Sequence, residues 1–141
     1  KLSSMVRIAR RFPFLERNKA LEMAAGRYVS FLDSDDRWKT DKLYNQIEFM
    51  EKNECAMCYT SYEIMDSHGK KTGKIMSYIP READYKSLLR NNYIGTLTVL
   101  IDRQYINDFH FTNNRHEDYL LWLDFVKRGY CLMGLDEPLA Y

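Results

Sequence analysis

Apolar and polar residues repeat along the chain in patterns that predict helices and strands in turn. Helical spacing predicts helices over about 14–25, 40–52, 84–91, a short segment beginning near Arg103, and 117–128. The second of these carries Leu43, Ile47 and Met50 at positions i, i+4 and i+7, which is one face of a helix. Gly26 and Gly129 follow predicted helices at the place where a C-terminal cap belongs.

Short β-prone apolar runs separate these helices. They predict strands over 28–32, 56–65, 74–79, 96–101 and 130–135. The turn-forming run 67–70 connects the second and third strands and predicts a hairpin. Because helices and strands alternate and one hairpin is antiparallel, we predict an α/β fold with a mixed sheet flanked by helices. A chain of 141 residues suits a single domain over 1–141.

Composition narrows the classes of function. Hydrophobic residues make up 45% and charged residues 29%, with a net charge of +1, which is typical of a folded domain and gives no basic surface for nucleic acid. No apolar stretch approaches the roughly 20 residues that span a bilayer. The odd count of cysteines, Cys55, Cys58 and Cys131, favours a reducing compartment. We interpret the C-x-x-C pair as packing residues, because a zinc site needs a second pair of ligands.

An acidic motif follows the first predicted strand. Asp33 and Asp35 are two residues apart, so their side chains point the same way if the strand geometry persists, and Asp36 follows directly. Ligands of open α/β folds bind at the carboxyl ends of strands, and paired carboxylates suit Mg²⁺ or Mn²⁺. The alternative is an acidic turn that only leaves the strand and caps the helix near Thr40.

A second acidic pair, Glu117 and Asp118, begins the helix predicted over 116–128. The structural interpretation is strong here, because acidic residues in a first turn satisfy free N–H groups, and Asn114 with Glu117 resembles a capping box. The functional alternative is a general base, in which a carboxylate near Trp122 takes a proton from a sugar hydroxyl. The residues alone leave both open.

The two motifs together resemble family 2 glycosyltransferases. Arg17–Asn18 and Ala24–Trp38 are similar to the family's A-R-N element and its A-x-G-x-Y-I-x-F-L-D-S-D-D-x-W block. Glu117–Leu123 and Lys127–Tyr130 are similar to its E-D-x-x-L-W-L block ending in G-Y, and Glu137–Tyr141 resembles the segment that follows. The resemblance runs from about residue 17 to the end and implies a GT-A fold, of which this chain would be the C-terminal portion.

The resemblance also implies roles on the donor side. Asp35 matches the family's direct metal ligand, and Asp33 matches the acid that helps to hold the metal or the donor's ribose. Arg17 and Asn18 match the element that lines the nucleotide-sugar pocket. The cofactor expected from the resemblance is Mg²⁺ or Mn²⁺ at the motif 33–36, and the expected donor is a nucleotide sugar.

On the acceptor side, Asp118 matches the family's catalytic base and Glu117 lies beside it in an acceptor-side role. The implied reaction is an inverting single displacement. The base deprotonates a hydroxyl of a carbohydrate or lipid-linked acceptor, and that oxygen attacks the anomeric carbon. We expect a cytoplasmic protein. Relatives that act on lipid-linked acceptors often dock on membranes, so peripheral membrane association stays open.

The chain also departs from the family pattern. The strand–helix–strand that binds the nucleobase is expected before residue 1, and residues 1–14 differ from the family's usual approach to the A-R-N element. Glu16 replaces the small residue before Arg17, and Lys19–Ala20 replaces the usual x-G. Two alternatives therefore stand. One is an inactive remnant or partner-binding fragment. The other is a haloacid-dehalogenase-like phosphatase, against which Asp36-Arg37-Trp38 counts, since that class has Gly-Thr or Gly-Val after its acidic motif.

Overall fold

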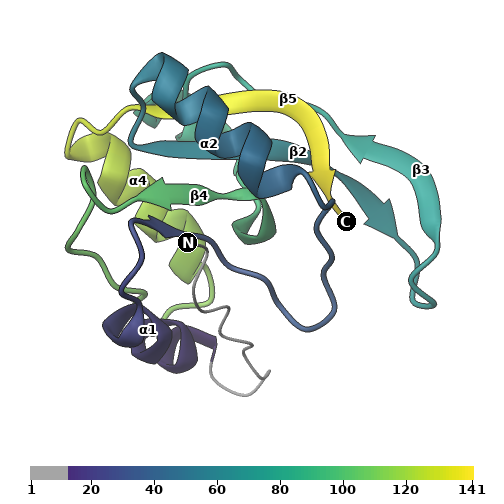
Figure 1. Cartoon of the computed structure of the whole chain (residues 1–141), viewed down its shortest axis with the longest axis horizontal. Coiled ribbons are helices and arrows are strands. Elements are labelled where there is room, and N and C mark those ends of the chain that lie inside the picture. The colour runs from purple at the N-terminus through teal and green to yellow at the C-terminus, as the bar shows by residue number, and fades with distance from the viewer. Residues whose placement is uncertain (1–12) are drawn as a thin grey trace.

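A computed structural model describes residues 13–141, so most of the divergent segment 1–14 lies outside the described residues. Figure 1 shows a twisted sheet with helices packed against it and one hairpin projecting from the body. The elements in chain order are α1 (Pro13–Met23), β1 (Tyr28–Val29), α2 (Lys42–Asn53), β2 (Met57–Met65), β3 (Lys71–Met76), α3 (Tyr85–Arg90), the 3-10 turn η1 (Thr96–Thr98), β4 (Leu100–Asp102), α4 (Glu117–Lys127) and β5 (Leu132–Ala140). No described helix is long and apolar enough to cross a membrane.

The sheet is mixed, as predicted. Its strands follow the order β1-β4-β2-β3, and β5 pairs in parallel with β2 while the other pairs are antiparallel. The predicted hairpin is present, with Gly69 in its turn at φ 74°, a conformation that glycine adopts without strain. The predicted strand over 28–32 is reduced to the two half-buried residues of β1, whose described partner is β4.

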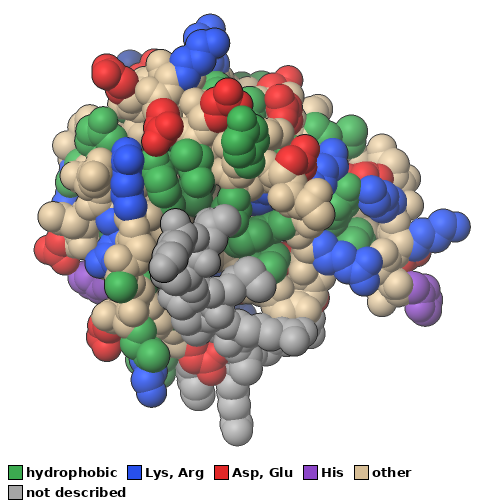
Figure 2. All heavy atoms as spheres, in the orientation of Figure 1, with side chains coloured by type: hydrophobic (Ala, Val, Ile, Leu, Met, Phe, Trp, Pro, Cys, Tyr) green, Lys and Arg blue, Asp and Glu red, His purple; other side chains and the backbone are tan. Residues whose placement is uncertain are grey.

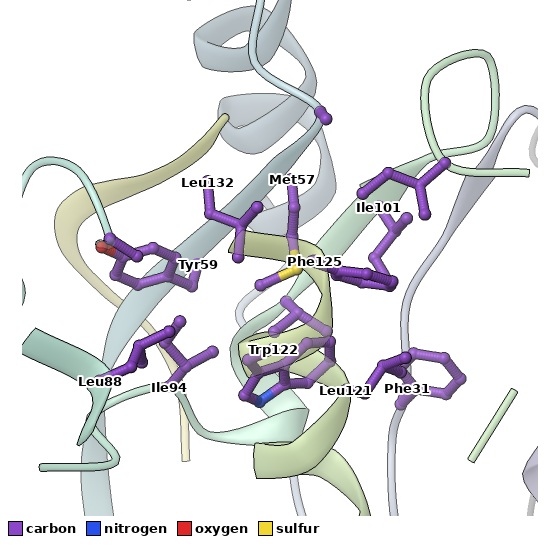
Figure 3. Close-up of a cluster of buried hydrophobic side chains, with 14 of the residues drawn as sticks. Phe31, Met57, Tyr59, Leu88, Ile94, Ile101, Leu121, Trp122, Phe125 and Leu132 are labelled. Atoms are coloured by element: carbon purple, nitrogen blue, oxygen red, sulfur yellow. The ribbon is translucent and has the colours of Figure 1, made fainter. Parts of the chain in front are cut away.

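Alternation along β2 gives the sheet two separate hydrophobic faces. Met57 and Tyr59 point into the larger core, where α4 contributes the fully buried Trp122 and Phe125 (Figure 3). Cys58 points to the opposite face, into a smaller cluster with Met50, Leu43 and Ile47 of α2. The two helices therefore cover opposite faces of the sheet, and the periodicity predicted for each of them is confirmed.

The cysteines are packing residues in the structure. Cys55 and Cys58 are buried and Cys131 is partly buried, and none of the three forms a disulfide. Burial raises the pKa of Cys55 to about 12 and that of Cys58 to about 11. A thiol that keeps its proton at neutral pH is a poor nucleophile and a poor metal ligand.

Three local predictions were wrong. The segment after β4 is a turn and not a helix, because the Asp102 carboxylate accepts the N–H of Gln104 at 2.9 Å and the Asp102 carbonyl accepts those of Tyr105 and Ile106. The run 96–101 begins as the 3-10 turn η1 and becomes a strand only at Leu100. Gly26 does not adopt a positive φ, so α1 ends without the left-handed cap expected there.

Lys42, the first residue of α2, is fully buried, and no carboxylate within residues 13–141 forms an ion pair with it. Its ammonium lies 4.3 Å from the centre of the Trp38 ring and donates to Ser30 Oγ at 3.3 Å. Burial lowers the pKa of Lys42 to about 7, against a smaller opposing effect of Cys58, which lies on the face of the sheet that α2 covers. The folded state therefore holds this proton less tightly than the unfolded chain does.

We predict that Lys42→Met stabilises the fold most at low pH. The unfolded chain binds more protons between pH 7 and the ordinary lysine pKa of about 10.5, so the wild type gains stability as the pH rises through this window. The variant lacks this titrating group, so its stability does not change with pH for this reason. Its free energy of unfolding should exceed that of the wild type by roughly 1–3 kcal/mol at pH 7, and this difference should vanish towards pH 10.5. Urea unfolding between pH 6.5 and 10 measures this gap. The exposed Lys52→Met control should show a flat difference, and a flat difference for Lys42→Met would refute the prediction.

Candidate active site

Backbone hydrogen bonds close the acidic turn 33–36 and hold its C-terminal end. The turn follows β1 and closes with the Asp36 N–H donating to the Asp33 carbonyl at 3.1 Å. Directly after it, Arg37 and Tyr141 exchange backbone hydrogen bonds of 3.0 and 2.8 Å, which ties the chain to the end of β5. The Trp38 indole N–H donates to the Leu97 carbonyl at 2.8 Å, so the turn is also tied to η1. The carboxylates are thus presented on a fixed loop.

The turn concentrates negative charge. Burial, helped by the neighbouring carboxylates of Asp33 and Asp35 and opposed by Arg17, raises the pKa of Asp36 to about 6. Asp35 is exposed. Like charges at this spacing oppose one another's ionisation, and a cation bound at the turn would relieve that repulsion.

A cleft of about 760 Å³ opens beside the turn. The acidic turn and Arg37 form one wall, and the β2–β3 hairpin forms the other. Lys and Arg side chains gather over that hairpin (Figure 2), where Lys71 donates to the Tyr141 hydroxyl at 2.7 Å. The cleft therefore combines carboxylates on one side with cationic groups nearby, a combination that suits a phosphorylated ligand and its counter-ion.

Arg17 connects the two acidic motifs. Its Nη2 donates to both oxygens of Asp33, at 3.1 and 2.9 Å, and its Nη1 donates to Glu117 Oε1 at 3.0 Å. The side chains of Arg17 and Glu117 are only 6% and 12% exposed, so the ion pair between them is largely shielded from water. Asp33 and Glu117 are far apart in the sequence, and both of their carboxylates contact the guanidinium of Arg17.

Asn18 has a different place. Its side chain forms a two-point contact with the backbone of Phe111, donating to the carbonyl at 2.8 Å and accepting the N–H at 2.7 Å. The Phe111 ring in turn lies 5.3 Å from the Arg17 guanidinium carbon. In this structure Asn18 fixes the segment that supports Arg17.

Asp118 is held by donors on both carboxylate oxygens. Thr96 Oγ donates to Oδ2 at 2.6 Å, and the Tyr119 N–H donates to Oδ1 at 2.7 Å. The capping-box alternative for this helix is not observed, because the N-cap is His116 without a side-chain cap, and Glu117 turns to Arg17. Glu117 also lines a separate cavity of about 380 Å³.

The structure therefore brings Arg17, Asp33 and Glu117 into contact, while Asn18 contacts Phe111 and Asp118 contacts Thr96. Two neighbouring residues of η1 link Asp118 to the cleft. Thr96 contacts Asp118, and Leu97 lines the cleft beside Asp35. The role of Thr96 could not be predicted from the sequence, because a threonine in an apolar run is as typical of a β-strand as of a functional site.

A divalent cation fits the acidic turn in part. The described residues contain no group of three or more His, Cys, Asp or Glu side chains placed to hold a metal alone. Asp35 lines the open cleft and Asp33 lies two residues before it in the same turn, and both carboxylates are hard oxygen ligands that suit Mg²⁺ or Mn²⁺. These two residues would hold the ion, and the remaining positions of its coordination shell would fall to a ligand diphosphate or water.

Comparisons with known proteins identify the family. Residues 7–124 match Glycosyl transferase family 2. The putative teichuronic acid biosynthesis glycosyltransferase TuaG of Bacillus subtilis is 45% identical over 125 residues, 88% of this chain and 49% of TuaG. The Escherichia coli protein WfgD, a UDP-Glc:α-D-GlcNAc-diphosphoundecaprenol β-1,3-glucosyltransferase, is 44% identical over 79% of this chain and 43% of its own length.

Solved structures give the same result for the fold. The S. aureus TarS 1–349 structure in complex with UDP-GlcNAc superposes with a TM-score of 0.63 over 92% of this chain and 38% of that one, at 23% identity. The chain spans about half the length of the curated relatives that it matches.

Proposed function

We propose, on the premise that this chain belongs to Glycosyl transferase family 2, that it transfers a sugar from a nucleotide-sugar donor to a lipid-linked carbohydrate acceptor. The predicted family and GT-A fold are confirmed by the family match and by the superposition with TarS. The activities named for TuaG and WfgD support cell-envelope polysaccharide synthesis, and the undecaprenol acceptor of WfgD supports a lipid-linked substrate. The family match favours this activity over the phosphatase alternative.

One observation carries the proposal. Arg17 places the acidic motif 33–36 and the start of α4 in one site, although they are far apart in the sequence. Group transfer between two substrates requires donor-side and acceptor-side residues in a common site. A helix capped only for stability has no reason to share a buried cation with this turn.

Each residue then has a role in an inverting displacement. Asp33 and Asp35 would hold the divalent cation, which when bound would supply positive charge for the departing nucleoside diphosphate. Asp118 takes the proton of the acceptor hydroxyl at a carboxylate oxygen, while Thr96 and the Tyr119 N–H keep that carboxylate in place. We propose a cytoplasmic site of action at the inner face of the membrane, where lipid-linked acceptors are available.

The test is a transfer assay with UDP-Glc and UDP-GlcNAc and with GlcNAc-diphosphoundecaprenol as acceptor. We expect Mn²⁺- or Mg²⁺-dependent product with an inverted anomeric configuration, read by NMR. A folded chain that gives no product with any donor would favour the inactive or partner-binding alternative. Product with a retained configuration would refute the single displacement.

Metal binding is a separate prediction. Asp35→Ala should abolish Mn²⁺ binding measured by isothermal titration, because it removes one of two carboxylate ligands. Asp41→Ala is the matched control, since Asp41 is exposed six residues later and its side chain makes no cap hydrogen bond to α2. Equal affinity in Asp35→Ala and the wild type would remove the motif as a metal site.

A further inference from the structure

Arg17 is a single buried cation shared by two carboxylates. Both carboxylate oxygens of Asp33 accept hydrogen bonds from one guanidinium nitrogen, and one oxygen of Glu117 accepts a hydrogen bond from another. The Phe111 ring packs against the guanidinium, and the side chain is 6% exposed, so little water reaches the group. Arg17 Nε has no hydrogen-bond partner among the described residues. Because so little water screens this charge, its interaction with each carboxylate has a measurable effect on the electrostatic potential at both acids.

The two carboxylates differ in what they face. The Asp33 side chain is 41% exposed and belongs to the acidic turn, whereas Glu117 is 12% exposed and belongs to α4. The positive charge of Arg17 beside Asp33 repels a second cation bound at the turn. The carboxylate of Glu117 partly neutralises that charge, so the net charge around Asp33 is more negative than it would be in a simple Arg–Asp pair.

We propose that Arg17 is a positioning residue that does not contact the donor, and that Glu117 acts through Arg17 to set the divalent-cation affinity of the turn 33–36. This inference rests on the metal site of the proposed function. It assigns to Arg17 a role different from lining the nucleotide-sugar pocket, and it gives Glu117 an effect on a site to which it contributes no ligand.

The proposal predicts opposite effects of two charge-removing changes on Mn²⁺ affinity at pH 7.5. Glu117→Gln keeps the shape of the side chain, leaves the whole guanidinium charge to Asp33 and should weaken Mn²⁺ binding about three- to tenfold. Arg17→Gln removes the positive charge with a shorter polar side chain and should strengthen Mn²⁺ binding by a similar factor. Loss of a merely structural contact would weaken binding in both variants.

Three further variants complete the experiment. Arg17→Lys keeps the charge and should stay within about twofold of the wild type, which also covers the case in which Arg17→Gln fails to fold. The double variant Arg17→Gln/Glu117→Gln should bind Mn²⁺ nearly as tightly as Arg17→Gln alone. Arg103→Gln is the charge-matched control, because Arg103 donates to backbone carbonyls of Ala24 and Gly26 and not to the turn.

Isothermal titration of each folded variant with Mn²⁺ decides the matter. Opposite shifts for Glu117→Gln and Arg17→Gln support the proposal. Shifts of the same sign, or no shift in either variant while the wild type binds Mn²⁺, overturn it and leave the metal site intact. Absence of Mn²⁺ binding in the wild type and in every variant would overturn the inference together with the metal site. Transfer activity is not needed for any of these outcomes.

Discussion

Asp118→Asn should lower kcat for sugar transfer by about 10²- to 10⁴-fold, the usual contribution of a general base, with little change in the KM of the donor. Asparagine keeps the shape of the side chain and can still contact Thr96, so the variant should fold. The measurement is steady-state transfer with saturating acceptor. Glu48→Gln on the exposed face of α2 removes one carboxylate at a distance and should keep full activity. Wild-type kcat in Asp118→Asn would show that another group takes the proton.

Thr96 gives this prediction a second arm. Its hydroxyl donates to Asp118 Oδ2 at 2.6 Å, so Thr96→Val should leave the base present but less well oriented, and kcat should fall roughly tenfold. Thr96→Ser restores the hydroxyl and should recover most of the loss. A Thr96→Ser variant as slow as Thr96→Val would mean that the methyl group, and not the hydrogen bond, is what matters.

Periodic features of the sequence predicted the fold well. Leu43, Ile47 and Met50 recur at helical spacing because one side of α2 is buried against the sheet, and the structure places them there. The alternation that separates Cys58 from its neighbours in β2 follows from the same local geometry. Patterns of this kind are visible in a few consecutive residues, so they need no knowledge of the rest of the chain.

The polar contacts of the site could be predicted only in part. The family resemblance indicated that Asp33, Arg17 and Glu117 belong to one site, but it did not indicate that one guanidinium holds both acids. An ion pair between residues 17 and 117 leaves no periodic trace, and each partner alone is as typical of a solvated helix face. The 3-10 turn at Thr96 was predicted as a strand because its long-range contacts likewise leave no periodic trace in the sequence.

Asp102 shows how a buried charge can redirect local structure. Its side chain is 2% exposed and accepts hydrogen bonds from Arg27 Nε at 3.1 Å and from Nη2 at 2.7 Å, and it also accepts the N–H of Gln104. These contacts tie β4 to the residue before β1, and Arg103 adds a backbone hydrogen bond to the Arg27 carbonyl at 2.8 Å. A helix starting near Arg103 would break this arrangement.

Asp102→Ala should therefore destabilise the fold by about 2–4 kcal/mol, because it leaves Arg27 without its main partner and breaks the turn after β4. The cost stays below that of a fully buried pair, since the Arg27 side chain is 39% exposed and can reach water and Glu51. In a domain of this size the melting temperature should fall by roughly 5–15 °C. The matched control is Asp124→Ala, whose pair with Arg128 is exposed on both sides and should contribute less than about 0.5 kcal/mol. Similar losses in the two variants would show that the Arg27–Asp102 pair does not hold β1 against β4.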